Sequence, residues 1–109
     1  MRIWDIPADK LCRNHLLGEH RELHAIWSII TKEKSGYAHH PEVVRWKGKS
    51  KALYLKHEEI VDEMIKRGYN HYSHIDIKIA TGKDKQDKYV DSVDDQIVIL
   101  KNKGCDCKI

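Results

Sequence analysis

Ionisable side chains between His15 and Glu22 occupy positions where an amphipathic helix of a small protein normally carries apolar residues. At about 100° per residue, one stripe of such a helix combines two carboxylates and an imidazole with apolar side chains; its members are Leu11, His15, Glu19, Glu22, Ile26 and Ile30. Burying an unpaired carboxylate is costly, so the group shifts its pKa or takes a cation as partner. The stripe therefore indicates chemistry rather than simple packing.

Two interpretations of the carboxylates follow from their spacing. Glu19 and Glu22 lie three residues apart, side by side on a helix, and His15 lies one turn before Glu19. Crowding in a pocket of low dielectric raises the pKa of at least one carboxyl toward the range of a general acid and base. The structural alternative is a set of ion pairs with arginines, for which the sequence offers Arg2, Arg13 and Arg45.

A metal site is a third interpretation of the same stripe. His15, Glu19 and Glu22 could converge on one ion, with the adjacent pair His39 and His40 as a source of further ligands. Zinc and iron sites do use histidines and carboxylates that project from helices. The chain contains no HExxH motif and no repeated pair of carboxylate and histidine, so this pattern is not specific.

The amino terminus is a candidate nucleophile. Arg2 is too bulky for efficient removal of the initiator methionine, so we expect the chain to begin at Met1 with a free α-amine. The pKa of an α-amine is about 7.7–8.0, against about 10.4 for lysine, which leaves roughly a tenth of it unprotonated at neutral pH. Such an amine can attack a sugar carbon or an aldehyde.

A basic segment follows the first predicted helix. Four cations, one tryptophan and no acid occur together as Arg45, Trp46, Lys47, Lys49 and Lys51. This composition suits a phosphate backbone with one stacked base, although the net charge of +3 does not by itself imply nucleic acid. The alternative is a solvated loop with Trp46 turned into the core.

Two long helices are expected to position these groups. The first is predicted from Ala8 or Asp9 to Lys34, with Gly36 as its stop, after an extended entry that ends at Pro7. The second is predicted from Ser50 to Gly68, and residues 37–49 are read as a connection.

The remaining chain carries weaker signals. Isoleucines alternate with polar residues over 75–79, which hints at a short strand. A capping pattern at Ser92 and Asp95 and the stop at Gly104 predict a final helix that ends at Lys103. We therefore predict a mainly α fold, a small bundle of about three helices with a long N-terminal helix and an irregular C-terminal part.

The length of 109 residues suits one domain, residues 1–109, with a single modest core. No apolar run reaches the length of a membrane span and no signal-peptide pattern opens the chain, so we expect a cytoplasmic protein that does not bind membranes. Cys12 is isolated and Cys105 and Cys107 lack zinc-finger spacing, so reduced thiols are expected.

The chain resembles the phage endonuclease V family of pyrimidine-dimer DNA glycosylases with abasic-site lyase activity, over roughly residues 1–70. Four elements carry the resemblance: the start Met1-Arg2-Ile3, the block from Leu11 through His15 and Glu19 to Arg21-Glu22-Leu23, the segment His40-Pro41 to Arg45-Trp46, and Lys66-Arg67-Gly68-Tyr69-Asn70. Residues 71–109 diverge from the family.

The resemblance implies a mechanism. The α-amine, here of Met1, attacks the anomeric carbon of the damaged nucleotide and forms an imine to the opened sugar, while Glu22 serves as acid and base. Arg2, His15 and Arg21 line the site or grip phosphates, and Glu19 is a supporting carboxylate. The partner is damaged double-stranded DNA, bound with help from Arg45, Trp46, Lys47 and Lys49.

The resemblance also implies a monomer that needs neither a cofactor nor a metal. Two other functions remain open from the residues alone. One is a module that binds nucleic acid without catalysis on the same scaffold, and the other is a metal-binding protein that uses His15, Glu19 and Glu22.

Overall fold

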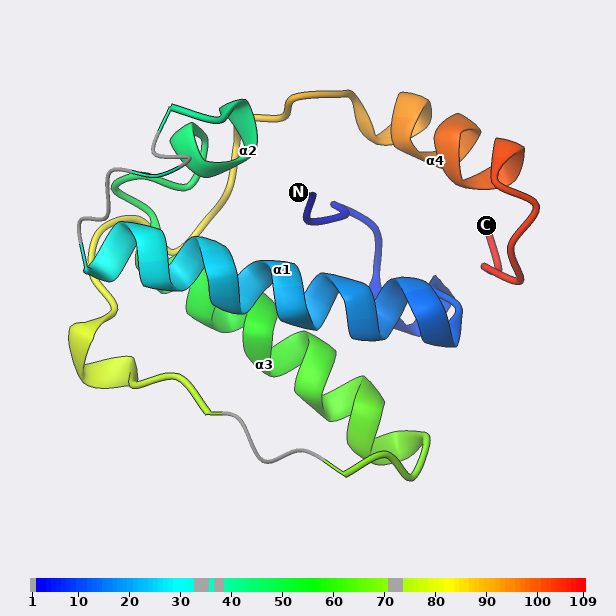
Figure 1. Cartoon of the computed structure of the whole chain (residues 1–109), viewed down its shortest axis with the longest axis horizontal. Coiled ribbons are helices and arrows are strands. Elements are labelled where there is room, and N and C mark those ends of the chain that lie inside the picture. Colours follow the sequence, from blue (N-terminus) through cyan, green and yellow to red (C-terminus); the bar gives the residue numbers. More distant parts are fainter. Residues whose placement is uncertain (1, 33–35, 37–38, 71–73) are drawn as a thin grey trace.

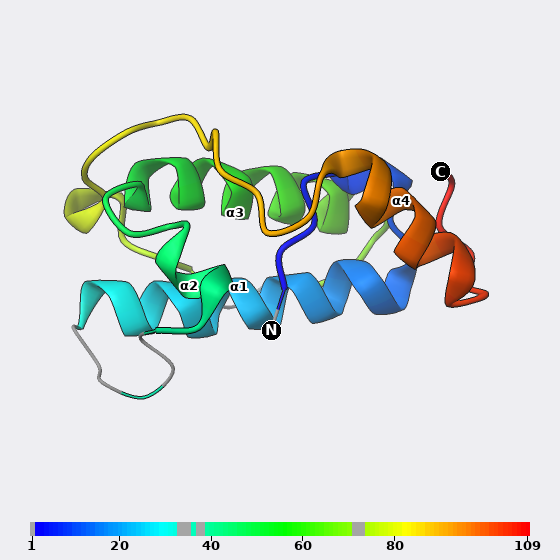
Figure 2. The same ribbon diagram turned by 90° about the horizontal axis from the view of Figure 1, so that it is seen from above.

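Two long helices form the body of the protein in the computed structural model, which describes residues 2–32, 36, 39–70 and 74–109. Helix α1 (Arg13–Thr31) packs along α3 (Ser50–Lys66), as Figures 1 and 2 show. The short α2 (Pro41–Val44) and α4 (Val93–Asn102) lie above α1 in Figure 1, with the N-terminal segment between them. The predicted mainly α fold is confirmed, with four α-helices and no strand in the described part of the chain.

The core lies between α1 and α3. Leu16, Leu23 and Ile26 of α1 are fully buried against Leu53 and Ile60 of α3. Their spacing on α1 places Glu19 in the middle of the buried stripe, whereas His15 and Glu22 lie at its half-buried margin. None of the described helices is long and apolar enough to cross a membrane.

The first helix begins later than predicted. Residues Ala8–Lys10 form one turn of 3-10 helix, Leu11 and Cys12 are extended, and α1 begins at Arg13. The interruption has a polar cause, because the guanidinium of Arg67 donates to the carbonyl of Leu11 at 2.6 Å and draws it away from a continuous helix. Helix α1 ends at Thr31, and the predicted end at Lys34 lies outside the described residues.

The second helix agrees with the prediction. Helix α3 begins at Ser50, ends at Lys66 and is followed by Gly68 with a φ of 80°. Its first N–H groups are capped by a distant loop, since the N–H of Lys51 donates to the carbonyl of Thr81 at 3.0 Å. A Cβ on Gly82 of that loop would lie 2.0 Å from the carbonyl oxygen of Gly48, so this contact requires glycine.

The C-terminal half corrects one prediction and confirms another. The strand predicted over 75–79 is wrong, because Ile77–Ile79 form a 3-10 turn in which the Asp76 carboxylate accepts the N–H of Lys78 at 2.9 Å. The predicted final helix is confirmed as α4, whose cap is Ser92, with Oγ accepting the N–H of Asp95 at 3.1 Å. Residues 41–44 were predicted as part of a connection but form helix α2. The helix begins at Pro41, and the imidazole of His40 caps it by accepting the N–H of Glu42.

The N-terminal segment, residues 2–7, is an extended stretch without a strand partner, buried between the helices. Side chains replace the missing strand, because backbone N–H groups of the segment and of the turn that follows it donate to acceptors on four helices. The pairs are Ile3 to Glu42 (3.1 Å), Trp4 to Glu19 (2.7 Å), Asp5 to Gln96 (2.8 Å) and Ala8 to Glu59 (2.9 Å).

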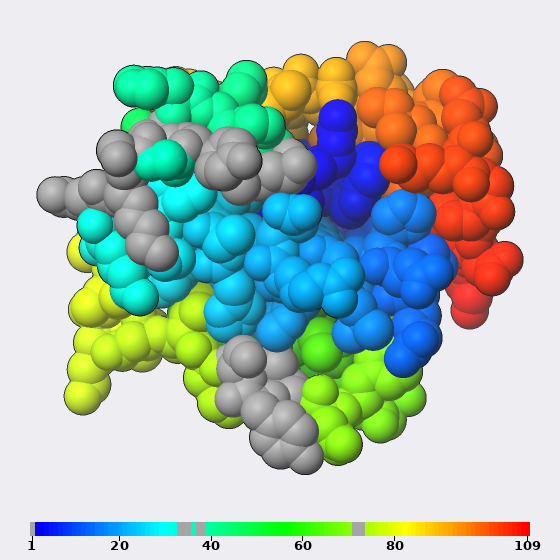
Figure 3. Space-filling model, viewed as in Figure 1, coloured from blue at the N-terminus to red at the C-terminus, as the bar shows by residue number. Residues whose placement is uncertain are grey.

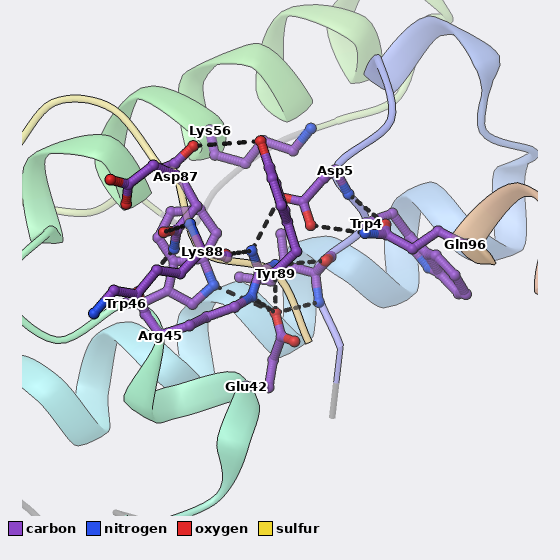
Figure 4. A network of polar contacts seen from close by, with 12 residues as sticks. Trp4, Asp5, Glu42, Arg45, Trp46, Lys56, Asp87, Lys88, Tyr89 and Gln96 are labelled. Carbon is purple, nitrogen blue, oxygen red and sulfur yellow. Dashed lines mark hydrogen bonds and ion pairs between the residues drawn. The ribbon is translucent and has the colours of Figure 1, made fainter. Parts of the chain in front are cut away.

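Arg45 neutralises the acids on one side of this segment (Figure 4). Its guanidinium, 5% exposed, contacts Glu42 Oε1 at 2.7 Å and Asp5 Oδ1 at 3.1 Å. It also donates to the carbonyl of Ile3 at 2.9 Å and to that of Lys88 at 3.0 Å. Arg45 therefore joins α2, the start of the chain and the loop before α4.

Removal of this guanidinium should be strongly destabilising. We expect Arg45→Ala to lower the free energy of unfolding by about 3–5 kcal/mol, because Glu42 would remain buried without its cation. The measurement is urea unfolding at pH 7. The exposed neighbour Lys47 is the control, and Lys47→Ala should stay within about 0.5 kcal/mol of the parent. Equal losses in the two variants would contradict this role.

Candidate active site

A pocket of about 190 Å³ lies where the N-terminal segment meets α1. Residues from both elements line it: Arg2, Trp4, Asn14, His15, Gly18, Glu19 and Glu22. In Figure 3 the dark blue N-terminal segment reaches the surface between α1 and the orange and red C-terminal part. The three ionisable residues of the predicted stripe therefore do meet at one place, close to the start of the chain.

Glu19 is the buried carboxylate of the pocket, with an exposed fraction of 2%. Its Oε1 accepts the Trp4 N–H, and its Oε2 is buried without a hydrogen-bond partner among the described residues. Burial raises the pKa of Glu19 to about 8, although Lys56 and the Trp4 N–H act in the opposite direction. A raised carboxyl pKa was predicted on this stripe, and Glu19 is the residue that has it.

Glu22 differs from Glu19 in its surroundings. It is half-buried at the pocket wall, one turn further along α1, and makes no hydrogen bond or ion pair with the rest of the described chain. Its carboxylate is therefore available to a molecule that enters the pocket, whereas Glu19 is occupied by the backbone of Trp4.

Two further predicted residues line the pocket. The guanidinium of Arg2 stacks over the Trp4 ring at 5.0 Å and pairs with Asp91 at 2.8 Å. The ring of His15 meets the Trp4 ring edge to face at 5.9 Å. Desolvation lowers the pKa of His15, and the positive charge of Lys103 adds to the effect.

Arg21 and Gly18 lie close together on α1. Arg21 is exposed on α1, and its Nη2 would lie 4.0 Å from a Cβ on Gly18. Gly18 itself lines the pocket. Among the described residues, a side chain at position 18 would therefore lie at the pocket and near Arg21. It would not contact the backbone of another element.

The basic segment is largely used inside the protein. Trp46 is 2% exposed, so the alternative in which it turns into the core is the one that the structure shows. Arg45 is committed to the network around Glu42, and the ammonium of Lys49 contacts Asp87 at 2.6 Å and Gln86 at 2.7 Å. The expectation that all these side chains face a ligand is therefore corrected, and Lys47 remains exposed.

The structural interpretation of the stripe is also corrected. Neither Glu19 nor Glu22 forms an ion pair within the described residues, because the arginines proposed for them have other contacts. Arg2 pairs with Asp91, Arg45 with Glu42 and Asp5, and Arg13 lies over the ring of Tyr69 at 5.8 Å.

The predicted metal ligands His15, Glu19 and Glu22 share this pocket, but their ligand atoms do not form a group close enough to bind one ion. Instead, the described residues contain two other groups with ligand atoms within 4.8 Å of one another. One consists of Cys12, His15, Cys105 and Cys107, and the other of His20, His24 and His57. Sequence reasoning missed both, although the first carries the signals Cys-x-x-His at 12–15 and Cys-x-Cys at 105–107.

A family model described as pyrimidine dimer DNA glycosylase matches residues 1–76 of the chain. The match includes every residue that lines the pocket and extends somewhat beyond the predicted resemblance over 1–70. No curated protein and no solved structure matches the chain. Met1, the predicted nucleophile, lies outside the described residues.

The raised pKa of Glu19 gives a test by pH. The unfolded carboxyl ionises near pH 4.5 and the folded one near 8, so the folded state holds the extra proton between these values. The free energy of unfolding should therefore fall by on the order of 3 kcal/mol from pH 4.5 to 8, relative to Glu19→Gln. Chemical unfolding across this range measures the difference. The exposed Asp62→Asn on α3 is the control, and parallel profiles for the parent and Glu19→Gln would contradict the assignment.

Proposed function

The chain belongs to the family of pyrimidine dimer DNA glycosylases, and we propose that it removes damaged pyrimidines through an imine between its α-amine and the deoxyribose. One observation carries this proposal: Arg2, the neighbour of Met1 in the sequence, lines the same pocket as Glu22. The N-terminal segment and α1 meet at this pocket. This supports a reaction in which the start of the chain supplies the nucleophile and α1 supplies the carboxylate.

The first step releases the base. The neutral α-amine of Met1 attacks C1′ of the sugar, a C–N bond forms, and the glycosidic bond breaks with its electron pair leaving on the base. Opening of the sugar ring then gives a protonated imine between Met1 and C1′. The carboxylate of Glu22, which has no competing partner in the described part of the protein, would stabilise this positive charge.

The second step cleaves the strand. A base removes a proton from C2′ of the imine, and the electrons move to break the bond between C3′ and the phosphate oxygen. We assign the proton transfer to Glu22 because it faces the pocket. Water then hydrolyses the imine and restores the free amine. No cofactor is needed for the balance of atoms or electrons.

The other residues of the pocket have supporting roles in this proposal. Glu19 accepts the Trp4 N–H and so fixes the segment that carries the amine. Arg2 and Arg21 supply positive charge beside the pocket for phosphates, and His15 completes its wall. Lys47, an exposed member of the basic segment, would contact damaged double-stranded DNA.

Borohydride trapping tests the chemistry. We expect borohydride to reduce the imine and link the full-length protein to duplex DNA that carries an abasic site or a pyrimidine dimer, but not to undamaged duplex. Glu22→Gln should lower the rate of strand cleavage by about 10²-fold or more, since the transfer of the C2′ proton loses its base. Single-turnover gel assays measure both products.

The controls separate catalysis from binding. Glu58→Gln, at a half-buried carboxylate of α3 that contacts His57 and does not line the pocket, should cleave DNA at the rate of the parent. Acetylation of the α-amine should abolish trapping. Damaged DNA that is bound without any trapped product at high protein concentration would overturn the proposed reaction and favour a module that only binds nucleic acid.

The salt dependence of binding tests the role of Arg21. If Arg21 contacts one phosphate, Arg21→Ala should reduce the slope of log affinity against log salt by about 0.9. Fluorescence anisotropy with an abasic duplex at several salt concentrations measures the slope. Lys32→Ala, a change at an exposed cation just after α1, should leave it unchanged. An unaltered slope in Arg21→Ala would contradict the phosphate contact.

A further inference from the structure

Three cysteines and one histidine from opposite ends of the chain meet beside the start of α1. Cys12 precedes the helix and His15 lies in its first turn, whereas Cys105 and Cys107 belong to the C-terminal segment after α4. Figure 1 shows that segment, in red, near the end of the molecule where α1 begins. The four ligand atoms all lie within 4.8 Å of one another, and the three cysteines are free thiols.

The distances fit a small tetrahedral ion. With Zn–S near 2.3 Å and Zn–N near 2.0–2.1 Å, a tetrahedral site separates two sulfurs by about 3.8 Å and a sulfur from a nitrogen by about 3.6 Å. Nδ1 of His15 lies 3.1 Å from the sulfur of Cys12 and 3.5 Å from that of Cys107. These two distances are within about half an ångström of the tetrahedral value, and the 4.8 Å limit on every other pair leaves movements of about 1 Å or less to complete the geometry. The ligand atoms are too close together for an iron–sulfur cluster.

The chemistry of these ligands points to the same ion. Three sulfurs and one imidazole form a soft, closed set of four protein ligands, as in structural zinc sites, with no open position for a substrate. One backbone group already donates to a ligand sulfur, because the N–H of Cys12 donates to the sulfur of Cys107 at 3.1 Å. Three thiolates and Zn²⁺ give a net charge of −1, and the cation Lys103 acts electrostatically on His15.

We propose that Cys12, His15, Cys105 and Cys107 bind one Zn²⁺ as a structural site. Binding releases the protons of the three thiols to solvent and leaves the sulfurs as thiolates; no oxidation is involved. The thiol of Cys105 now donates to the carbonyl of Leu100 at 3.4 Å, a contact that is lost on ligation.

The site would join the two ends of the domain. Hydrogen bonds already connect them: the N–H of Lys108 donates to the carbonyl of Lys10 at 2.7 Å, and the N–H of Cys12 donates to the sulfur of Cys107 at 3.1 Å. A bound zinc would fix the C-terminal segment against the first turn of α1. It would also hold the ring of His15, which lines the pocket described above, and leave its Nε2 as the protonated nitrogen.

The histidine group is a weaker candidate for the same ion. The Nε2 atoms of His20 and His57 lie 3.2 Å and 3.1 Å from Nε2 of His24, and each ring makes a further interaction. This group offers three nitrogen ligands among the described residues, whereas the cysteine group offers the four ligands that a structural zinc site requires. It serves as the competing site in the test.

The first experiment uses the full-length protein purified under reducing conditions. Elemental analysis should find one zinc per chain, and replacement by Co²⁺ should produce charge-transfer bands from thiolate to cobalt and the intense visible bands of tetrahedral cobalt. Removal of zinc by a chelator should lower Tm by about 10 °C or more, and added Zn²⁺ should restore it.

Two variants locate the ion. Cys107→Ala should lose zinc and the thiolate bands, whereas Asp106→Asn, at the exposed residue between the two cysteines, should keep both. If Cys107→Ala does not fold, the cobalt spectrum of the parent and that of Asp106→Asn still decide whether thiolates bind the metal.

Three results would overturn the proposal. One is a protein that neither contains zinc nor binds added Zn²⁺ or Co²⁺, with three thiols that react freely in the native state. Another is a mass lower by two hydrogens, which indicates a disulfide. The third is cobalt bound without thiolate bands and lost in His24→Ala, which assigns the ion to the histidine group.

Discussion

The start of the chain is an extended segment buried without a strand partner, and the fold depends on satisfying its backbone. Buried N–H groups need acceptors, and no neighbouring strand offers carbonyls within the described residues. Each helix supplies one acceptor instead: Glu42 from α2, Glu19 from α1, Gln96 from α4 and Glu59 from α3. The position of the segment against α1, and therefore the pocket, follows from these four hydrogen bonds.

Three of these acceptors are carboxylates; two of them pair with a cation and the third does not. Glu42 is paired with Arg45, and Glu59 with Lys56 at 3.0 Å. Glu19 has no such pair, and burial raises its pKa to about 8, so at neutral pH a proton takes the place of the cation. The N–H of Trp4 thus takes up one oxygen of Glu19, whereas Glu22 lines the pocket without a partner among the described residues. Arg45 is buried by its contacts with Glu42 and Asp5.

Periodicity was sufficient to predict the two long helices and the shared face of His15, Glu19 and Glu22, because both depend on local spacing. It failed where distant groups decide the structure. The Arg67 guanidinium interrupts the first helix at Leu11, and Trp46 and Lys49 turn inward toward partners that spacing cannot identify. The group formed by Cys12, His15, Cys105 and Cys107 joins residues more than 90 positions apart, so only the fold reveals it.

We propose that the α-amine of the first residue is the nucleophile and that it acts with Glu22, which lines the same pocket as Arg2. Peptide mapping by mass spectrometry of the protein trapped on abasic DNA tests it most directly. We expect the reduced sugar to be attached to the α-amine of the peptide that begins with Met1. A sugar found on a lysine side chain, with the α-amine unmodified, would contradict it.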